Sequence, residues 1–407
     1  MEIIQGGVTA AQGFLAAGTA AEIKYKDRKD MALVYSKVPA KVAGTFTKNI
    51  VKAAPVKWDI NIVKNCETAQ AVILNSGIAN ACTGQEGAEA NLKMAQAAAE
   101  ELNVDEKAVL TASTGVIGMS LPVERITKGA KTAASLLSDT LEAGHMASEA
   151  IMTTDTISKE CAVTFELNGK KVTIGGMSKG SGMIHPDMAT MLCVITTDAA
   201  ISKQMLQKVV SDDVKKSFNM ISVDRDTSTN DSLIVLANGL AGNREIVVED
   251  ADYQTFCQAF GMVTKVLAKM MAGDGEGATK LFESKVIHAK SQEDAVLLSK
   301  SIITSNLVKT AVYGNDANWG RIICALGYSG AEFDPEVVDL YIESSAGRLK
   351  LMENGVATDY SEQKATEILS QKEVTAIADM KAGDANAVAW GCDLTYDYVK
   401  INGDYRS

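Results

Sequence analysis

A glycine-rich loop that runs directly into an apolar segment constrains this chain more than any other feature. The loop from Lys179 to Asp187 contains two glycines and a proline, and Met191 to Thr197 is an apolar run typical of a buried strand. Ala189 and Thr190 lie at the junction. Because glycine and proline favour backbone conformations that other residues resist, this junction can hold a strained peptide bond. We place the chemistry of the chain here.

A hydroxyl next to a strained peptide bond can attack it. Attack of the Thr190 hydroxyl on the Ala189 carbonyl gives an ester, and water then cleaves the ester and leaves Thr190 as a new N-terminus. A free α-amine has an ordinary pKa of about 7.7–8.0, so near neutral pH it can act as the base for its own hydroxyl. A simpler alternative is that Ala189-Thr190 is only the place where a loop enters a strand, since the dipeptide alone has little specificity.

The segment from Lys179 to Leu192 resembles a signature of the ornithine acetyltransferase family, also called the bifunctional glutamate N-acetyltransferases of arginine biosynthesis. Family members carry the signature Lys-Gly-x-Gly-Met-Ile-x-Pro-x-Met-Ala-Thr-Met-Leu and cleave themselves between its Ala and its Thr. Every fixed position of that signature is present in this chain. Similar segments run from about residue 5 to the C-terminus: Asn75–Gly84, Thr111–Gly118 with Leu121-Pro122, Ile151–Thr156, Asp274–Lys280, Asn315–Arg321 and Asn402–Ser407. Many members end in Thr where this chain has Ser407.

The resemblance implies an activity and an assembly. The acetyl group of N-acetylornithine passes to Thr190 as an ester, ornithine leaves, and L-glutamate accepts the acetyl group in a ping-pong reaction. Cleavage yields an alpha chain of residues 1–189, with the oxyanion hole and a substrate loop, and a beta chain of residues 190–407 that begins with the nucleophile. Two copies of each form a heterotetramer. Some members also make N-acetylglutamate from acetyl-CoA, and the sequence leaves that co-substrate open.

The segment Ser113-Thr114-Gly115 resembles the family's oxyanion hole. The Thr114 hydroxyl and the Gly115 N–H are the expected donors to the negatively charged oxygen of a tetrahedral intermediate, and glycine lets the backbone come close to the reacting centre. Without the resemblance, Ser-Thr-Gly is better explained as a turn after a buried strand.

Lys179 is an expected substrate ligand, because its ammonium can bind a carboxylate or lower the pKa of the nearby α-amine by like-charge repulsion. Glu276 can bind the cationic amine of a substrate, although its Asp-Gly-Glu-Gly surroundings also suit a flexible acidic turn. The sequence does not decide between Thr153 and its neighbour Thr154. The residues that the resemblance marks as substrate ligands are Thr153, Lys179, Thr190, Glu276, Asn402 and Ser407.

Other classes of function fit less well. The glycine-rich segments match neither a Walker A pattern nor GxGxxG after a strand, so nucleotide binding is not expected. The polar run from Ser222 to Asp231 departs from EF-hand spacing, and we interpret it as a solvated or internally hydrogen-bonded loop that supports the site. Two alternatives stay open: a self-processing aminopeptidase or amidase with water as acceptor, and a non-catalytic binding protein that stays uncleaved.

Composition limits the setting. The 407 residues carry a formal net charge of −11, which argues against nucleic acid as the main partner. No apolar run reaches the roughly 18 residues of a membrane helix and the N-terminus does not resemble a signal peptide, so we expect a cytoplasmic protein. Seven cysteines without a CxxC pair and three scattered histidines indicate no disulfide framework and no metal site, and no cofactor is expected.

Helical and strand patterns alternate along the chain. Asn168-Gly169 between two β-rich runs predicts a hairpin. Helices are predicted over 87–102, 124–143, 202–217, 252–271, 295–312 and 361–370, and further strands over 191–197, 233–237, 281–289, 337–342, 348–352 and 388–399. With the resemblance, this order predicts a layered mixed α/β sandwich of the self-processing N-terminal-nucleophile type, with two subdomains.

Overall fold

The computed structural model describes residues 1–185 and 191–404. The chain forms two compact units. The first comprises residues 1–180, 186–219 and 227–267, and the second comprises residues 181–185, 220–226 and 268–407. The chain therefore passes from one unit to the other several times, and two of these boundaries, after residues 180 and 185, fall in the glycine-rich loop.

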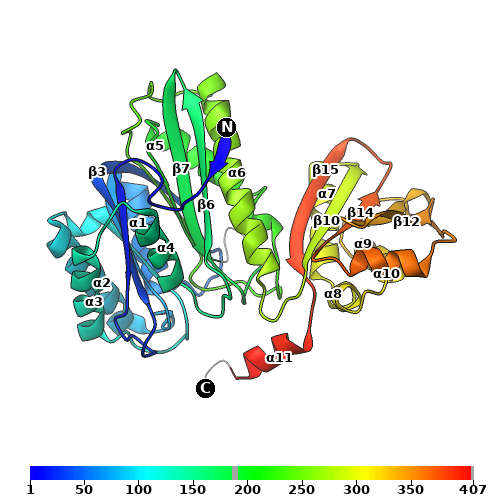
Figure 1. Ribbon diagram of the computed structural model, residues 1–407, viewed down its shortest axis with the longest axis horizontal. Coiled ribbons are helices and arrows are strands. Elements are labelled where there is room, and N and C mark those ends of the chain that lie inside the picture. Colours follow the sequence, from blue (N-terminus) through cyan, green and yellow to red (C-terminus); the bar gives the residue numbers. More distant parts are fainter. Residues whose placement is uncertain (186–190, 405–407) are drawn as a thin grey trace. The chain divides into compact units, whose positions relative to one another are not determined.

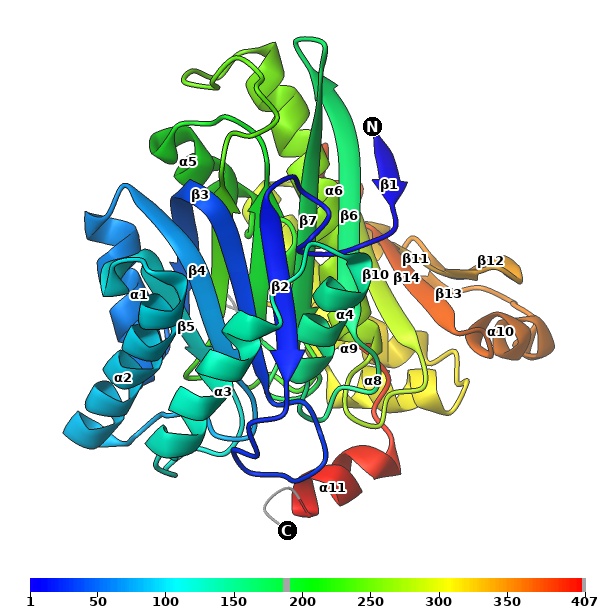
Figure 2. The ribbon, with the colours of Figure 1, turned by 60° about the vertical axis from the view of Figure 1, so that its left-hand side comes forward.

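The first unit is built on a nine-stranded sheet (Figures 1 and 2). The strand order is β1-β6-β7-β8-β9-β3-β4-β5, and β2 pairs with β3. The β4/β5 and β8/β9 pairs are parallel and the others are antiparallel. The strands are β1 (Glu2–Ile4), β2 (Phe14–Thr19), β3 (Met31–Phe46), β4 (Thr68–Asn75), β5 (Val109–Ser113), β6 (Lys159–Leu167), β7 (Lys170–Lys179), β8 (Leu192–Thr197) and β9 (Ser232–Ala237).

Strand β3 takes part in two cores. Because successive side chains of a strand point to opposite faces, Val34 packs in one core with Leu192 and Ile234, while Leu33 packs in a second core with Met94 of a covering helix. The pairing of β3 with β4 shifts register between residues 35 and 40, an irregularity that bends a strand. Both cores lie between the sheet and helices, since the first also contains Ala147 and Ala150 of a helix.

Helices cover this sheet. Figure 2 shows α1, α2 and α3 beside β3, β4 and β5, and α2 packs against both α3 and β5. The helices are α1 (Ala54–Asn65), α2 (Gly84–Leu102), α3 (Val123–Ser135), α4 (Leu141–Ala150), α5 (Lys203–Asp213) and α6 (Ala251–Gly273), and the last six residues of α6 group with the second unit. Short 3-10 helices span Glu106–Ala108, Phe218–Met220 and Pro335–Val337.

The second unit contains a six-stranded sheet of order β13-β12-β11-β14-β10-β15, in which only β10 and β14 are parallel among the described pairs (Figure 1). Helix α7 packs on β10 and β15, and α10 packs on β11 and β12. Its elements are β10 (Leu281–Ala289), α7 (Gln292–Thr304), α8 (Asn306–Tyr313), α9 (Trp319–Gly327), β11 (Asp339–Ser344), β12 (Gly347–Glu353), β13 (Val356–Ala357), α10 (Glu362–Leu369), β14 (Glu373–Asp379), β15 (Ala385–Cys392) and α11 (Tyr396–Gly403).

Most predicted elements are present. The predicted hairpin joins β6 to β7, and its turn residues Asn168 and Gly169 have φ angles of +51° and +70°, as a type I′ turn requires. Layered α/β architecture with two units is confirmed. The division at residue 189 concerns chain cleavage, and it stays a prediction because the compact units follow other boundaries.

Three predicted elements are wrong in extent, each because a capping residue starts a new helix. The predicted helix 124–143 is α3 and α4, and Thr140 caps α4 by accepting from the Ala143 N–H. The predicted helix 295–312 is divided at Ser305, which caps α8. The predicted strand 388–399 ends at Cys392, and Thr395 then caps α11.

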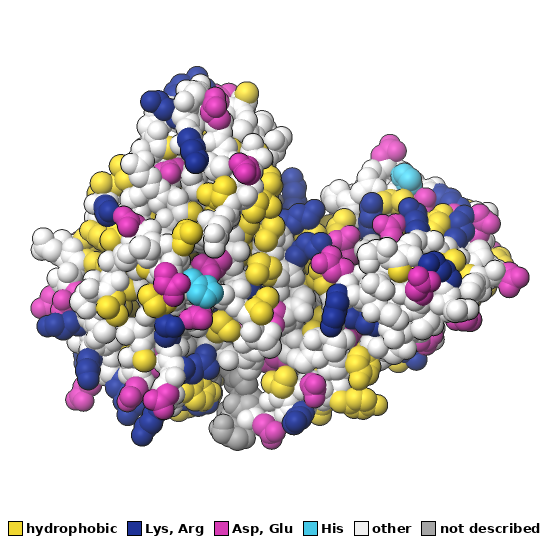
Figure 3. All heavy atoms as spheres, viewed as in Figure 1, with side chains coloured by type: hydrophobic (Ala, Val, Ile, Leu, Met, Phe, Trp, Pro, Cys, Tyr) yellow, Lys and Arg dark blue, Asp and Glu magenta, His cyan; other side chains and the backbone are white. Residues whose placement is uncertain are grey.

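Acidic and basic side chains are interspersed on the face shown in Figure 3, including the surface over β10, β12 and α10 of the second unit. Among the described residues there, Lys350 and Lys381 both pair with Asp339, and Lys350 also pairs with Glu353. The charges on this surface are therefore largely matched locally rather than gathered into a single basic area.

Candidate active site

Three of the predicted site residues meet in the first unit. Lys179, at the end of β7, donates through Nζ to the Thr153 hydroxyl at 2.8 Å and to the Thr114 hydroxyl at 3.3 Å. Thr114 directly follows β5, and Thr153 lies in the loop after α4. Lys179 is only 7% exposed. Three segments far apart in sequence thus place one ammonium and two hydroxyls within hydrogen-bond distance. Thr153 is the threonine of the Thr153-Thr154 pair that touches Lys179.

Asp155 places a buried carboxylate beside this ammonium. Its carboxylate lies 3.8 Å from Lys179 Nζ, accepts from Lys159 Nζ at 2.7 Å, and accepts from the Gly180 N–H at 2.7 Å. Burial alone would raise the pKa of Asp155, but the charges of the two lysines and these hydrogen bonds hold it well below its usual range. Asp155 is therefore ionised, and its negative charge lies beside both lysine side chains.

Sequence reasoning did not assign roles to Asp155 and Lys159. Lys159 is fully buried, which is rare for lysine unless it is paired. The two residues are four apart in sequence, but the segment between them is not helical, so no spacing rule predicts the pair. An acidic residue inside the Ile151–Thr156 segment was the available signal.

Gly115 occupies a position that other residues cannot. Its φ is +130°, and a Cβ there would lie 2.2 Å from the Gly77 carbonyl carbon and 2.6 Å from the Ile78 nitrogen. The neighbouring Thr114 N–H donates to the Asn75 carbonyl and the Val116 N–H to the Gly77 carbonyl, so two hydrogen bonds hold this close approach. Glycine is required here because the two backbone segments touch.

The polar run from Ser222 to Asp231 is partly buried. Thr229, Asn230 and Asp231 are 8%, 6% and 1% exposed, so for these residues the solvated-loop alternative is wrong and the internally hydrogen-bonded one is right. Asn230 Nδ2 donates to the carbonyls of Ser113, at 2.8 Å, and Ala79, at 2.6 Å. Asn230 therefore holds the backbone that leads directly into Thr114.

The expected nucleophile is two residues from the start of β8 in the sequence. Ala189 and Thr190 fall outside the described residues, as does Ser407. The described chain resumes at Met191, and Leu192 then pairs with Lys179 on one side and with Ser232 on the other. The strand that follows Thr190 is thus the immediate neighbour of the strand that ends with Lys179.

The second unit brings together the two other described site residues. Asn402, on α11, donates through Nδ2 to Glu276 Oε2 at 2.7 Å. Glu276 is 6% exposed, and its N–H donates to the Ser181 carbonyl at 3.0 Å. Gly182 leaves room for the Glu276 carboxylate, since a Cβ on Gly182 would come within 2.4 Å of it. Part of the glycine-rich loop therefore packs on Glu276 within this unit.

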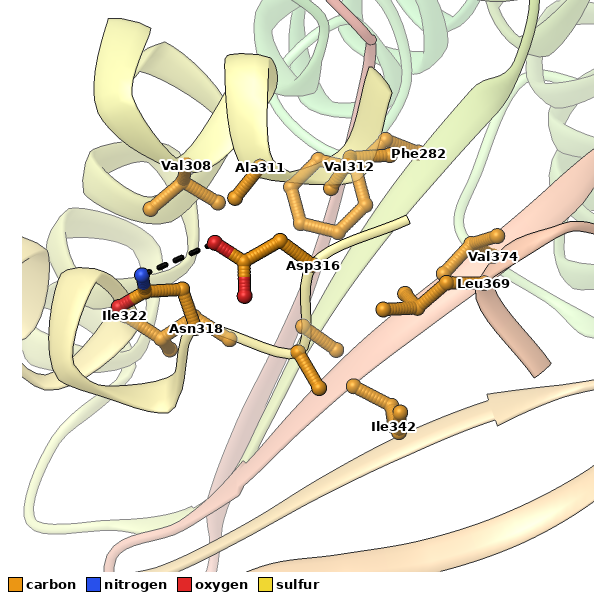
Figure 4. A pocket seen from close by; sticks show the side chains of 12 residues that line it. Phe282, Val308, Ala311, Val312, Asp316, Asn318, Ile322, Ile342, Leu369 and Val374 are labelled. Carbon is orange, nitrogen blue, oxygen red and sulfur yellow. Dashed lines mark hydrogen bonds between the residues drawn. The ribbon is translucent and has the colours of Figure 1, made fainter. Parts of the chain in front are cut away.

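The Asn315–Arg321 segment contributes residues to a mostly apolar pocket of the second unit. Asn318 donates to Asp316 at 3.1 Å at one end of this pocket, and apolar side chains form most of its lining (Figure 4). None of the described lining residues is cationic, so nothing there matches the α-carboxylate of a substrate. The lining residues are Phe282, Val308, Ala311, Val312, Asp316, Ala317, Asn318, Ile322, Ile342, Leu369, Val374 and Ala376.

Residues 1–185 and 191–404 contain no group of three His, Cys, Asp or Glu side chains arranged to hold a metal ion. Within the same ranges, no helix combines the length and the apolar character that crossing a membrane requires.

Comparison with known proteins gives full-length matches. The model of the ArgJ family matches residues 15–407. The arginine biosynthesis bifunctional protein ArgJ of Caldanaerobacter subterraneus subsp. tengcongensis is 51% identical over 407 residues, covering all of both chains. The crystal structure of the ArgJ protein of Bacillus halodurans is 44% identical to this chain. The match covers 51% of this chain and 96% of the crystallised one, with a TM-score of 0.49. An ornithine acetyltransferase of Mycobacterium tuberculosis, solved with ornithine, is 39% identical, covering 47% and 99%, with a TM-score of 0.44.

These matches define an acetyltransferase of arginine biosynthesis. The chain belongs to the ArgJ family. The predicted family and the predicted glutamate N-acetyltransferase activity are confirmed, and the roles of individual residues are taken up as proposals below.

Proposed function

We propose that this chain cleaves itself between Ala189 and Thr190, and that Thr190 then carries the acetyl group from N-acetylornithine to L-glutamate. The observation that carries the proposal is the contact of Lys179 with Thr114 and Thr153 at the end of β7, beside the strand that begins after Thr190. An ammonium, two hydroxyls and a close backbone approach at Gly115 are gathered near the start of β8, the strand that begins two residues after Thr190 in the sequence.

The chemistry follows from these groups. The freed α-amine of Thr190 takes the proton of its own hydroxyl as the oxygen attacks the acetyl carbon. The Thr114 hydroxyl and the Gly115 N–H stabilise the oxyanion, and each such donor typically contributes about 2.7–4 kcal/mol. Release of ornithine leaves the acetyl-Thr190 ester, and the amine of glutamate attacks it. The same donors serve both steps because both pass through a tetrahedral intermediate.

Substrate recognition divides between two kinds of charge. Lys179 and Thr153 supply donors for a carboxylate, while Glu276 and Asn402 supply acceptors for a cationic amine, which N-acetylornithine carries on its side chain. Ser407 adds a hydroxyl to this set. Lys179 also lowers the pKa of the Thr190 α-amine by like-charge repulsion, which favours the neutral, basic form.

The family membership supports three further parts of the proposal. The two fragments, residues 1–189 and 190–407, stay together and pair into a heterotetramer of two alpha and two beta chains. The enzyme works in the cytoplasm without a metal or other cofactor. Relatives are named bifunctional, and we assign acetyl-CoA as the co-substrate of the second activity.

Intact-mass measurement of the purified protein tests the proposal. We expect two fragments that begin at Met1 and Thr190, whereas Thr190→Ala gives a single chain of 43.1 kDa that transfers no acetyl group. Transfer by the Thr190→Ala variant would show that another residue is the nucleophile. Assay with amino-acid amides separates the aminopeptidase alternative: amide hydrolysis without formation of N-acetylglutamate would favour water as acceptor.

A further inference from the structure

One buried carboxyl group near the start of β8 has no role in the mechanism so far. Asp231 precedes β9 and is 1% exposed, and its Oδ2 atom has no hydrogen-bond partner among the described residues. Buried polar atoms are almost always hydrogen-bonded, so an orphaned carboxyl oxygen calls for a specific explanation. Its position supplies one.

Asp231 lies beside the residue that follows the proposed nucleophile. Ser232 donates through its N–H to the Met191 carbonyl at 2.8 Å, and Ser232 pairs with Leu192 in the β8/β9 register, which sets Asp231 next to Met191. Met191 directly follows Thr190, and Cα atoms of consecutive residues are only about 3.8 Å apart across a trans peptide bond. Asp231 therefore lies next to the residue that follows the proposed cleavage site in the sequence.

The surroundings of Asp231 favour its protonated form. Burial raises the pKa of Asp231 well above its usual range, and the Ser228 and Thr47 hydroxyls, the Met191 N–H and the charge of Lys179 oppose that rise. Lys179 is the charged group that acts on this carboxyl. A buried acid that keeps its proton can donate it, as buried catalytic carboxylic acids do.

The turn that carries Asp231 also reaches the proposed oxyanion hole. Asn230, one residue earlier, donates to the carbonyl of Ser113, and Thr114 follows Ser113. Two adjacent residues of one turn therefore contact the strand that follows the nucleophile and the strand that leads to the oxyanion donors. The turn therefore links Met191, which follows Thr190 in the sequence, to Ser113, which precedes Thr114.

We propose that Asp231 holds the proton that the Thr190 nitrogen takes up when the chain cleaves itself. This inference rests on the proposed function, because it requires Thr190 to be the nucleophile. It adds a proton donor for the leaving nitrogen, which the oxyanion donors and Lys179 do not supply.

The proton balance of the step is complete. The Thr190 oxygen forms a bond to the Ala189 carbonyl carbon, and the bond from that carbon to the Thr190 nitrogen breaks. Asp231 gives its proton to the departing nitrogen, and the hydroxyl proton of Thr190 returns to the Asp231 carboxylate. Water then adds to the ester, so that Ala189 gains a carboxylic acid and Thr190 regains its hydroxyl. No oxidant, reductant or further co-reactant is needed.

Cleavage of the newly made full-length chain tests this role. Wild type, Asp231→Asn and Asp231→Glu are synthesised in a cell-free system across a pH series, and fragment formation is followed by intact mass. Because general acid catalysis contributes a factor of about 10²–10⁴, we expect Asp231→Asn to cleave at least about 100-fold more slowly. Asp231→Glu retains a carboxyl and should cleave faster than Asp231→Asn. The ratio of wild-type to Asp231→Asn rates should fall as pH rises, because the held proton is lost.

Asp198→Asn is the matched control. Asp198 follows the opposite end of β8, is 4% exposed, accepts from the Thr173 and Gln12 N–H groups, and has a pKa raised by burial. We expect it to cleave at the wild-type rate. Equal slowing by Asp198→Asn, wild-type cleavage by Asp231→Asn, or a rate ratio independent of pH would each overturn the role of Asp231. Cleavage of Thr190→Ala after residue 189 would instead overturn the proposed function.

Discussion

The two groups of site residues are held in opposite ways. In the first unit, Lys179, Asp155 and Lys159 form a buried ionic group; the two lysines belong to the neighbouring strands β7 and β6, and Asp155 lies in the loop before β6. In the second unit, Glu276 lies on a loop and its partner Asn402 is exposed on α11, a helix with no buried residue. The difference fits the division of labour proposed above, in which the first group is preorganised for chemistry and the second binds the substrate.

The comparison makes its strongest prediction at Asp155. Asp155→Asn removes the carboxylate that Lys159 and Lys179 both face, and removing one partner of a buried ion pair costs about 3–5 kcal/mol. We expect a loss of this size in the free energy of unfolding, measured by urea titration in the uncleaved Thr190→Ala background. Asp339→Asn is the matched control in the second unit, since its partners Lys350 and Lys381 are about one third exposed and should lose less.

Asp155 should also make the free energy of unfolding depend on pH in the acid range. The pKa of Asp155 is lowered in the folded protein, so its stabilising contribution is present above the unfolded value of about 3.9 and is lost as pH falls below it. Unfolding free energy should therefore fall more steeply below that pH in the Thr190→Ala protein than in the same protein carrying Asp155→Asn. Parallel acid profiles would show that Asp155 is not ionised in the fold.

The close approach at Gly115 predicts a loss of turnover. Gly115→Ala places a Cβ 2.2 Å from the Gly77 carbonyl carbon, so the oxyanion donors must move, and loss of one such donor lowers kcat by about 10²–10³. Gly118→Ala is the control, because Gly118 also has a positive φ, of +81°, but open space around it. If both variants lowered kcat equally, backbone strain rather than the contact with Gly77 would be the cause.

Replacement of Glu276 should affect KM more than kcat. Glu276→Gln removes the charge that faces a cationic amine, and a hydrogen bond to a charged group contributes about 1.5–3 kcal/mol. We expect KM for N-acetylornithine to rise at least about tenfold with a smaller change in kcat. A fall in kcat at unchanged KM would place Glu276 in the chemical step and remove the proposed division between the units.

The smallest expected effect is at Asn402. Asn402→Ala removes one hydrogen bond to Glu276, worth about 0.5–1.5 kcal/mol, so KM for N-acetylornithine should rise only severalfold. Lys400→Ala, also exposed on α11, should leave KM unchanged. A larger effect from Lys400→Ala than from Asn402→Ala would indicate that charge on α11, and not the contact with Glu276, matters.

Sequence alone went furthest where local rules apply. The Asn168-Gly169 hairpin and the Ser202 cap of α5 follow from turn and capping chemistry within a few residues. The merged helices at 124–143 and 295–312 were wrong because Thr140 and Ser305 are ordinary residues in an apolar periodic pattern, and their caps become visible only with the backbone geometry. Local patterns therefore predicted which elements exist better than where they begin.

Contacts across the sheet were beyond such rules. The bonds of Asn230 to Ala79 and Ser113 join residues more than a hundred positions apart, and the register of β3 determines whether they meet. The meeting of Lys179 with Thr114 and Thr153 was implied only by the family resemblance. The sequence did not indicate that Asp155 is the ionic partner of Lys179, because this role of Asp155 depends on its burial in the folded chain.

Mass analysis of the protein after incubation with N-acetylornithine alone tests the central claim most directly. Without glutamate the acetyl ester should accumulate, so the account predicts one added acetyl group on the fragment that begins at Thr190 and none on the fragment that begins at Met1. A fully active preparation consisting only of the intact 43.1 kDa chain, or an acetyl group carried on any other residue, would contradict it.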